Sequence, residues 1–178
     1  MIETLTKIVS KLNFDDVDKD SFSSWDSLVI NKRKPHTFRM MKQIGKYRLC
    51  LHKFEPCSDE ECFIHPHSWP ASFLVLAGSY IQTFSTSNTL SSPPHPVSRE
   101  IVGPGHTYEI TTPFTWHKIQ PLETTYTIML NGPPFTHYHT KCRFTKGKDL
   151  DKMSHVEKNS MMGQFNYLVL TWKHLLGL

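Results

Sequence analysis

The sequence predicts a mainly β domain, a sandwich or barrel, with helical segments at both ends. Short apolar segments recur at roughly ten-residue intervals through the middle of the chain, and Gly and Pro stand between them. Near both ends, apolar residues recur instead at spacings of three and four, which favours helices. The chain has 178 residues and no internal repeat, so we expect one domain over 1–178 with a substantial core.

The N-terminal region, residues 1–36, is expected to be a helical extension. Its first amphipathic pattern consists of Ile2, Leu5, Ile8, Val9 and Leu12. A shorter pattern follows at Phe22, Trp25, Leu28 and Val29, with Ser21 available as an N-cap. The sequence therefore predicts two helices before Pro35.

Residues 37–135 are expected to form the β core. Two strands joined by a turn at Gly45 come first, and alternation places Tyr47, Leu49 and Leu51 on one face of the second. Further strands are expected at 63–67, 72–77, 79–84, 98–102, 107–111, 116–120 and 124–131. The Ser- and Pro-rich stretch 85–96 is expected to be a long exposed hairpin loop.

The remaining residues, 136–178, begin as a polar, basic loop and end in a helix. The helical stripe consists of Phe165, Leu168, Val169, Trp172, Leu175 and Leu176. A helix of this kind can cover one open face of a β core.

Composition excludes several classes of function. The chain has no run of 18 apolar residues, which argues against a membrane span, and its first 20 residues lack the apolar core of a signal peptide, so we expect a cytoplasmic location. The net charge of +4 and two short basic clusters, at 32–34 and 141–152, do not form the continuous basic face of a nucleic-acid-binding protein. The four cysteines contain no CxxC pair, and free thiols are expected.

The pattern with most chemical content is the pair His65 and His67. Two histidines two positions apart on an extended segment present both imidazoles on the same face. An apolar strand follows them, so the donors would stand on a rigid scaffold. A third donor, His117, lies on a predicted strand after a Gly-Pro-Gly turn. Three neutral imidazoles suit iron(II), nickel, copper or zinc better than magnesium or calcium.

A different ligand set is also compatible with the sequence. His65 and His67 could be two surface histidines near a turn, and His106, which directly follows the Gly-Pro-Gly turn, competes with His117 as third ligand. Glu109 could supply a carboxylate. His137 and His139 also stand two apart, but in a segment that we expect to be surface loop.

The histidine pattern resembles that of the cupin superfamily. His65, His67 and Gly78 match its first motif, and the turn at Pro104 with His117 matches its second more loosely. The resemblance covers about residues 37–135. It implies a double-stranded β-helix, the jelly-roll barrel of the cupins, around one metal ion.

Within the cupins, three histidines without the usual acidic ligand resemble the thiol dioxygenases, which include cysteine dioxygenase. Ser72 stands where the acid would be, and the resemblance implies functional roles for Ser72 and for Arg39, the latter as the group that holds a substrate carboxylate. The segment 130–135 also resembles that family. In cysteine dioxygenase, a cysteine at the position of Ser72 can form a crosslink with a tyrosine at the position of Asn131, and this pair is absent here. That family also has a serine–histidine–tyrosine relay, whose positions are occupied here by Thr127, Met129 and Asn131.

The resulting hypothesis is a mononuclear iron(II) dioxygenase that acts on a small thiol and dioxygen, as a monomer or homodimer. Nickel, manganese and zinc are alternative metals. A metal-binding cupin of another class, such as a lyase or isomerase, and a non-enzymatic cupin that binds a small ligand are alternative functions.

Overall fold

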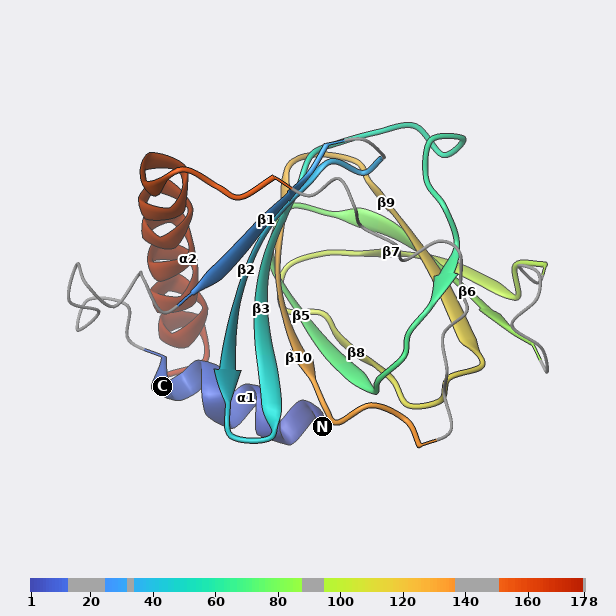
Figure 1. Cartoon of the computed structure of the whole chain (residues 1–178), viewed down its shortest axis with the longest axis horizontal. Helices are drawn as coiled ribbons and strands as arrows, with labels where there is room; N and C mark the ends of the chain where they lie inside the picture. The colour runs from blue at the N-terminus through green and yellow to red at the C-terminus, as the bar shows by residue number, and fades with distance from the viewer. Residues whose placement is uncertain (13–24, 32–33, 88–94, 137–150, 178) are drawn as a thin grey trace.

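A computed structural model of the chain describes residues 1–12, 25–31, 34–87, 95–136 and 151–177. Two antiparallel sheets face one another, and two helices lie on one side of the pair (Figure 1). The six-stranded sheet consists, in spatial order, of β1 (Asp26–Ile30), β2 (Thr37–Ile44), β3 (Tyr47–Phe54), β10 (Thr125–Asn131), β5 (Ala71–Ala77) and β8 (Thr107–Ile110). The four-stranded sheet consists of β4 (His65–Pro66), β9 (Thr115–Pro121), β6 (Tyr80–Thr86) and β7 (Ser98–Val102).

The central strands of the larger sheet are buried on both faces. In β3, Leu49 and Leu51 point toward the helices, whereas Cys50 and Phe54 point between the sheets. This is the period-2 alternation of a strand with apolar neighbours on either side. The predicted orientation of Leu49 and Leu51 is therefore found, and the opposite face of the strand is buried as well.

Two helices cover the outer face of the six-stranded sheet (Figure 1). Helix α1 (Ile2–Lys11) buries Leu5 and Val9 against it. Helix α2 (His155–Leu175) begins with a capping box, in which the Ser154 hydroxyl accepts from the Glu157 amide and the Glu157 carboxylate accepts from the Ser154 amide. The buried side chains of α2 are Met161, Met162, Phe165 and Val169. Helices at both ends of a mainly β chain confirm the predicted fold class.

The second predicted helix is wrong. Residues 26–30 form the edge strand β1, which pairs with β2 from Asp26 opposite Met41 to Ile30 opposite Thr37. On its other side, the Val29 amide donates to the Asp151 carbonyl at 2.7 Å. A four-residue pattern at spacings of three and four does not distinguish a short helix from an edge strand, and strand pairing decided the outcome. Residues 21–24 lie outside the described residues.

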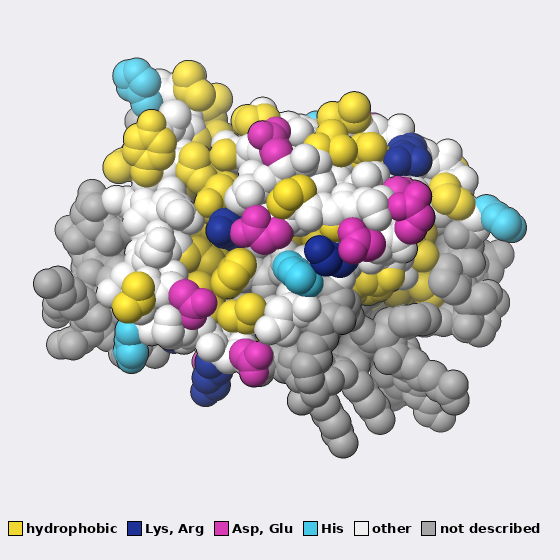
Figure 2. All heavy atoms as spheres, turned by 90° about the horizontal axis from the view of Figure 1, so that it is seen from above, with side chains coloured by type: hydrophobic (Ala, Val, Ile, Leu, Met, Phe, Trp, Pro, Cys, Tyr) yellow, Lys and Arg dark blue, Asp and Glu magenta, His cyan; other side chains and the backbone are white. Residues whose placement is uncertain are grey.

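The surface of the described residues carries interspersed charges. In the view of Figure 2, basic and acidic side chains lie next to each other. Lys53 pairs with Glu55 at 2.8 Å, and Asp59 pairs with Lys118 at 2.8 Å. None of the described helices has the length and apolar composition that crossing a lipid bilayer requires.

Gly78, between β5 and β6, is the most tightly constrained glycine of the described part of the chain. Its φ is +74°, and a Cβ there would collide with the Thr124 carbonyl oxygen and come within 2.7 Å of the Thr125 hydroxyl oxygen. We expect Gly78→Ala to reduce the free energy of unfolding by about 3 kcal/mol, because left-handed strain adds to a backbone clash.

Gly45→Ala is the matched control. Gly45 also has a positive φ, +58°, but nothing lies within 4 Å of its Cβ position, so this change should cost only about 1 kcal/mol. Urea denaturation of both variants makes the comparison. Equal losses in the two proteins would show that the close approach at Gly78 does not constrain the fold.

Candidate metal centre

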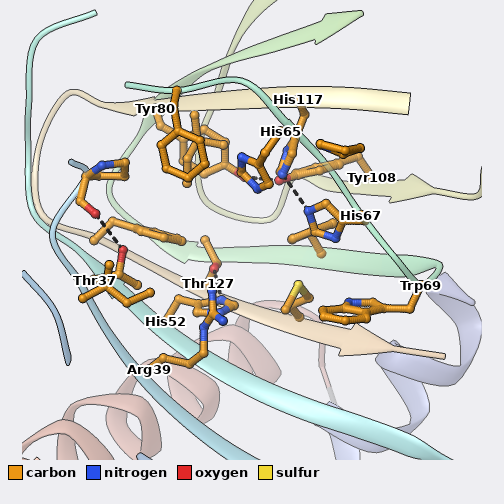
Figure 3. A pocket seen from close by; sticks show the side chains of 18 of the residues that line it. Thr37, Arg39, His52, His65, His67, Trp69, Tyr80, Tyr108, His117 and Thr127 are labelled. Carbon is orange, nitrogen blue, oxygen red and sulfur yellow. Dashed lines mark hydrogen bonds between the residues drawn. The ribbon is translucent and has the colours of Figure 1, made fainter. Parts of the chain in front are cut away.

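Three histidines converge in the space between the sheets. His65 on β4 stands opposite His117 on β9 in the register of the antiparallel pair, and His67 follows two residues later on the same face as His65. One ring nitrogen from each of the three lies within 4.8 Å of the other two (Figure 3). The ring centroids are 4.6 Å apart for His65 and His117 and 4.7 Å apart for His67 and His117. Two separate segments thus present three nitrogen donors to one point.

The buried histidines are held neutral. Burial lowers the pKa of His67 and of His117 well below the ordinary value of 6.5, and the neighbouring imidazoles lower it further. A neutral imidazole has a lone pair that a cation can use, whereas a protonated one has none. The environment therefore keeps these donors ready for a metal ion at neutral pH.

A glutamine orients one of the donors. The side-chain amide nitrogen of Gln82, on β6, lies 3.0 Å from Nδ1 of His117, and Nε2 of that ring faces Nε2 of His67 at 2.8 Å. A half-turn of the carboxamide, which exchanges its nitrogen and oxygen at nearly the same positions, would let the oxygen accept the Nδ1–H hydrogen bond and leave Nε2 as the bare donor. Such a contact fixes the tautomer and ring orientation of a metal-binding histidine.

The histidines stand in the wall of a cavity of about 250 Å³ between the two sheets. Most of the wall is apolar or aromatic, including Phe63, Phe73 and Met129. The ring centroid of Phe73 lies 5.8 Å from those of both His67 and His117. The polar part of the opposite wall comes from β2, β3 and β10 and includes Arg39, His52 and Thr127 (Figure 3).

Arg39 gives the cavity a positive charge. It lies opposite His52 in the β2–β3 register, and the described lining contains no Asp or Glu. Burial lowers the pKa of His52 well below 6.5, and the Arg39 charge lowers it further, so His52 adds no second charge at neutral pH. The cavity thus combines neutral nitrogen donors with a cationic side chain, an environment suited to a small anion.

A pair of phenols also lines the cavity. The hydroxyl of Tyr80 donates to the hydroxyl of Tyr108 at 2.9 Å, and Tyr108 stacks on Phe73 with 4.5 Å between ring centroids. Burial raises the pKa of both tyrosines above the ordinary value of 10. Both phenols therefore remain protonated at neutral pH and can act as hydrogen-bond donors.

The structure does not bring Ser72 to this cavity. Ser72 is fully buried on the opposite face of β5, where its hydroxyl donates to Glu109 at 2.8 Å. Because side chains alternate along a strand, an offset of one position reverses the face, and it is Phe73 that faces the histidines. The catalytic role suggested for Ser72 therefore has no support in the geometry.

Glu109 and His106 both lie away from the histidine cluster. The Glu109 carboxylate accepts the hydrogen bond from Ser72, and the His106 ring lies 6.1 Å from that of Tyr108. Neither residue lines the cavity, so neither is a ligand in this arrangement. His137 and His139 lie outside the described residues.

Sequence reasoning missed Gln82, His52 and the tyrosine pair. Their positions on predicted strands were available, but whether a side chain faces this cavity depends on the pairing of strands that are distant in the chain. The one local signal was that His52 directly follows the apolar residues Leu49, Cys50 and Leu51 on a predicted strand.

The residues present fit a single divalent transition-metal ion. Three imidazoles converge, no carboxylate belongs to the cluster among the described residues, and the donors are buried and neutral. Hard cations such as magnesium and calcium prefer oxygen ligands, which are absent from this group.

Comparison with known proteins shows the fold. No protein-family model and no curated protein sequence matches the chain significantly. Among solved structures, iron(II)-bound HppE with an alternative substrate is similar with a TM-score of 0.50 and 10% identity, over 66% of this chain and 60% of that chain. Hydroxypropylphosphonic acid epoxidase from S. wedmorenis gives 0.48 and 10%, over 65% and 61%, and KdgF from Halomonas sp. gives 0.45 and 15%, over 62% and 88%.

The shared architecture is the cupin jelly roll, as the sequence predicted. The match spans about 60% of the length of the HppE chain, and at 10% identity it establishes the fold alone. Fold and site together define a protein of the cupin jelly-roll fold with a cluster of three histidines that could hold a metal ion.

Stability of the metal-free protein should depend strongly on pH. The folded-state pKa values of His52, His67 and His117 lie below 6.5, so as pH falls through 6.5 the unfolded chain takes up protons that the folded protein does not. Each such histidine should lower the folding equilibrium constant by up to about tenfold per pH unit.

Urea denaturation between pH 7 and pH 5, above the range of most carboxylates, measures this slope. His52→Asn should reduce it by about one proton. Stability independent of pH over this range would contradict the buried, neutral state of the three rings.

Proposed function

We propose that the protein is a mononuclear metal-dependent cupin, and specifically an iron(II) dioxygenase that acts on a small anionic thiol. The observation that carries the proposal is the convergence of His65, His67 and His117 in a cavity that also contains Arg39. Manganese, nickel and zinc are the alternative ions. A bound iron(II) would supply open coordination positions for a thiolate and for dioxygen.

Each part of the cavity has a distinct role in this proposal. Arg39 pairs with the carboxylate or other anionic group of the substrate and fixes its orientation. The aromatic wall around Phe73 excludes water. Tyr108, whose hydroxyl is paired with Tyr80, remains protonated and offers a hydrogen-bond donor on the same side of the cavity as the histidines.

Metal binding should require all three histidines. Purified protein is expected to bind about one divalent ion per chain, and His65→Ala, His67→Ala or His117→Ala should each weaken Co²⁺ binding by tenfold or more, because two nitrogens cannot complete the site. Titration calorimetry gives the affinity, and elemental analysis of protein purified without added metal identifies the native ion.

His106→Ala is the matched control, since this histidine lies outside the cavity, and it should bind Co²⁺ like the unaltered protein. Equal affinity in the His117→Ala variant and the control would overturn the metal site. Unchanged thermal stability in the presence of a chelator would favour a non-enzymatic cupin instead.

Arg39 should matter for anionic thiols and not for neutral or cationic ones. In oxygen-uptake assays of the iron-loaded protein, Arg39→Met should raise KM for a thiol carboxylate such as 3-mercaptopropionate by about tenfold or more, because a charge-assisted hydrogen bond is lost. KM for cysteamine, which has no carboxylate, should change by less than about threefold.

Equal effects of Arg39→Met on both thiols would contradict the anchoring role. Metal binding without oxygen uptake for any thiol would instead favour a lyase or isomerase on the same scaffold. The two experiments therefore separate the metal site from the reaction.

A further inference from the structure

Two cysteines meet in the loop that leads into the metal centre. Cys57 and Cys62 lie between β3 and β4, both are partly exposed, and their sulfur atoms are 3.2 Å apart. A disulfide bond is about 2.05 Å long, so the two sulfurs need to approach by only about 1 Å to be bonded.

The loop itself holds the thiols together. The Ser58 amide donates to the Glu61 carboxylate at 3.0 Å, and the Cys62 amide donates to the Asp59 carbonyl at 3.2 Å. The thiol of Cys62 also lies 3.3 Å from the Ser58 carbonyl oxygen. These bonds bend the chain into a compact turn, and the proximity of the sulfurs therefore follows from the turn's own geometry.

We propose that Cys57 and Cys62 form a reversible dithiol–disulfide pair, which a small-molecule disulfide of the glutathione class oxidises. The Cys57 thiolate attacks one sulfur of the oxidant, forms a mixed disulfide and releases the first thiol. The Cys62 thiolate then attacks the sulfur of Cys57 and releases the second. The two cysteine thiols lose two electrons and two protons, and the oxidant becomes two thiols.

The environment distinguishes the two sulfurs. Burial raises the pKa of both thiols, that of Cys62 to about 12, but the hydrogen bond between them opposes the rise at Cys57. Cys57 is therefore the thiol that attacks first. Few thiolates exist at neutral pH, so the exchange is expected to be slow.

The loop between β3 and β4 contacts the surroundings of two of the three histidines, His65 and His117. Directly after Cys62, the Phe63 ring lies 4.8 Å from that of His65. Asp59, inside the loop, pairs at 2.8 Å with Lys118, the neighbour of His117. Closing the disulfide restrains the segment that delivers His65 and should slow the release of a bound ion; this consequence rests on the proposed metal function.

The first test concerns the bond alone. Protein with Cys142→Ser is incubated overnight with glutathione disulfide, free thiols are counted under denaturing conditions, and peptide mapping identifies the linked pair. We expect two thiols to be lost, Cys50 to stay reduced because it is buried, and dithiothreitol to restore both. The Cys57→Ser variant should form no intrachain bond. Retention of all thiols, or a mixed disulfide that never resolves, would overturn the pair.

The second test concerns its effect on the metal site. Oxidised and reduced protein are loaded with Co²⁺, and transfer of the ion to a chelator is followed in time. Release from the oxidised form should be at least threefold slower, and the difference should vanish in Cys57→Ser. Equal release rates would overturn the coupling while leaving the disulfide intact. Failure of both forms to bind Co²⁺ would refute the proposed metal function instead.

Discussion

The pairing of β4 with β9 is the contact on which the site depends. It joins only two residue pairs, His65 with His117 and Pro66 with Trp116, yet it brings together histidines that lie far apart in the chain. So short a pairing needs support from its neighbours. On the far side of β9, seven residue pairs join it to β6, and Trp116 is completely buried. Strand β9, which is held by its long pairing with β6, thus positions the two-residue strand β4.

Burial on both faces of the six-stranded sheet makes room for polar chemistry inside the barrel. The helices bury apolar residues against its outer face, so the main apolar core does not depend on the inner face. The inner face can then carry Arg39, His52 and Thr127, whose burial alone would not stabilise a fold. The position of the cavity follows from this division between an apolar outer core and a mixed inner one.

Alternation and turn residues were enough to predict most strands of the β core along the chain and to single out the three histidines. Ser72 lies outside the cavity because a one-residue offset reverses which face a strand residue occupies, and the pairing of Ser72 with Leu130 and Glu109, both remote in sequence, sets that register. Strand β6 extends to Thr86, into the predicted loop, because its pairing with β9 continues to Thr115. The edge strand β1 was missed for the same reason: its partner, not its local pattern, determines its structure.

Charge balance connects the metal cluster with the opposite wall. Three neutral imidazoles leave a divalent ion with its full charge, and Arg39 adds a further positive charge to a cavity whose described lining has no acid. Positive charge in a poorly solvated space favours the entry of a negative ligand. Under the function proposed above, a small molecule with two anionic groups could place one at the ion and one at Arg39. Under the same proposed function, the lack of an acidic ligand among the described residues of the cluster would favour a substrate with two anionic groups, because a protein carboxylate at the ion would take the place of one of its charges.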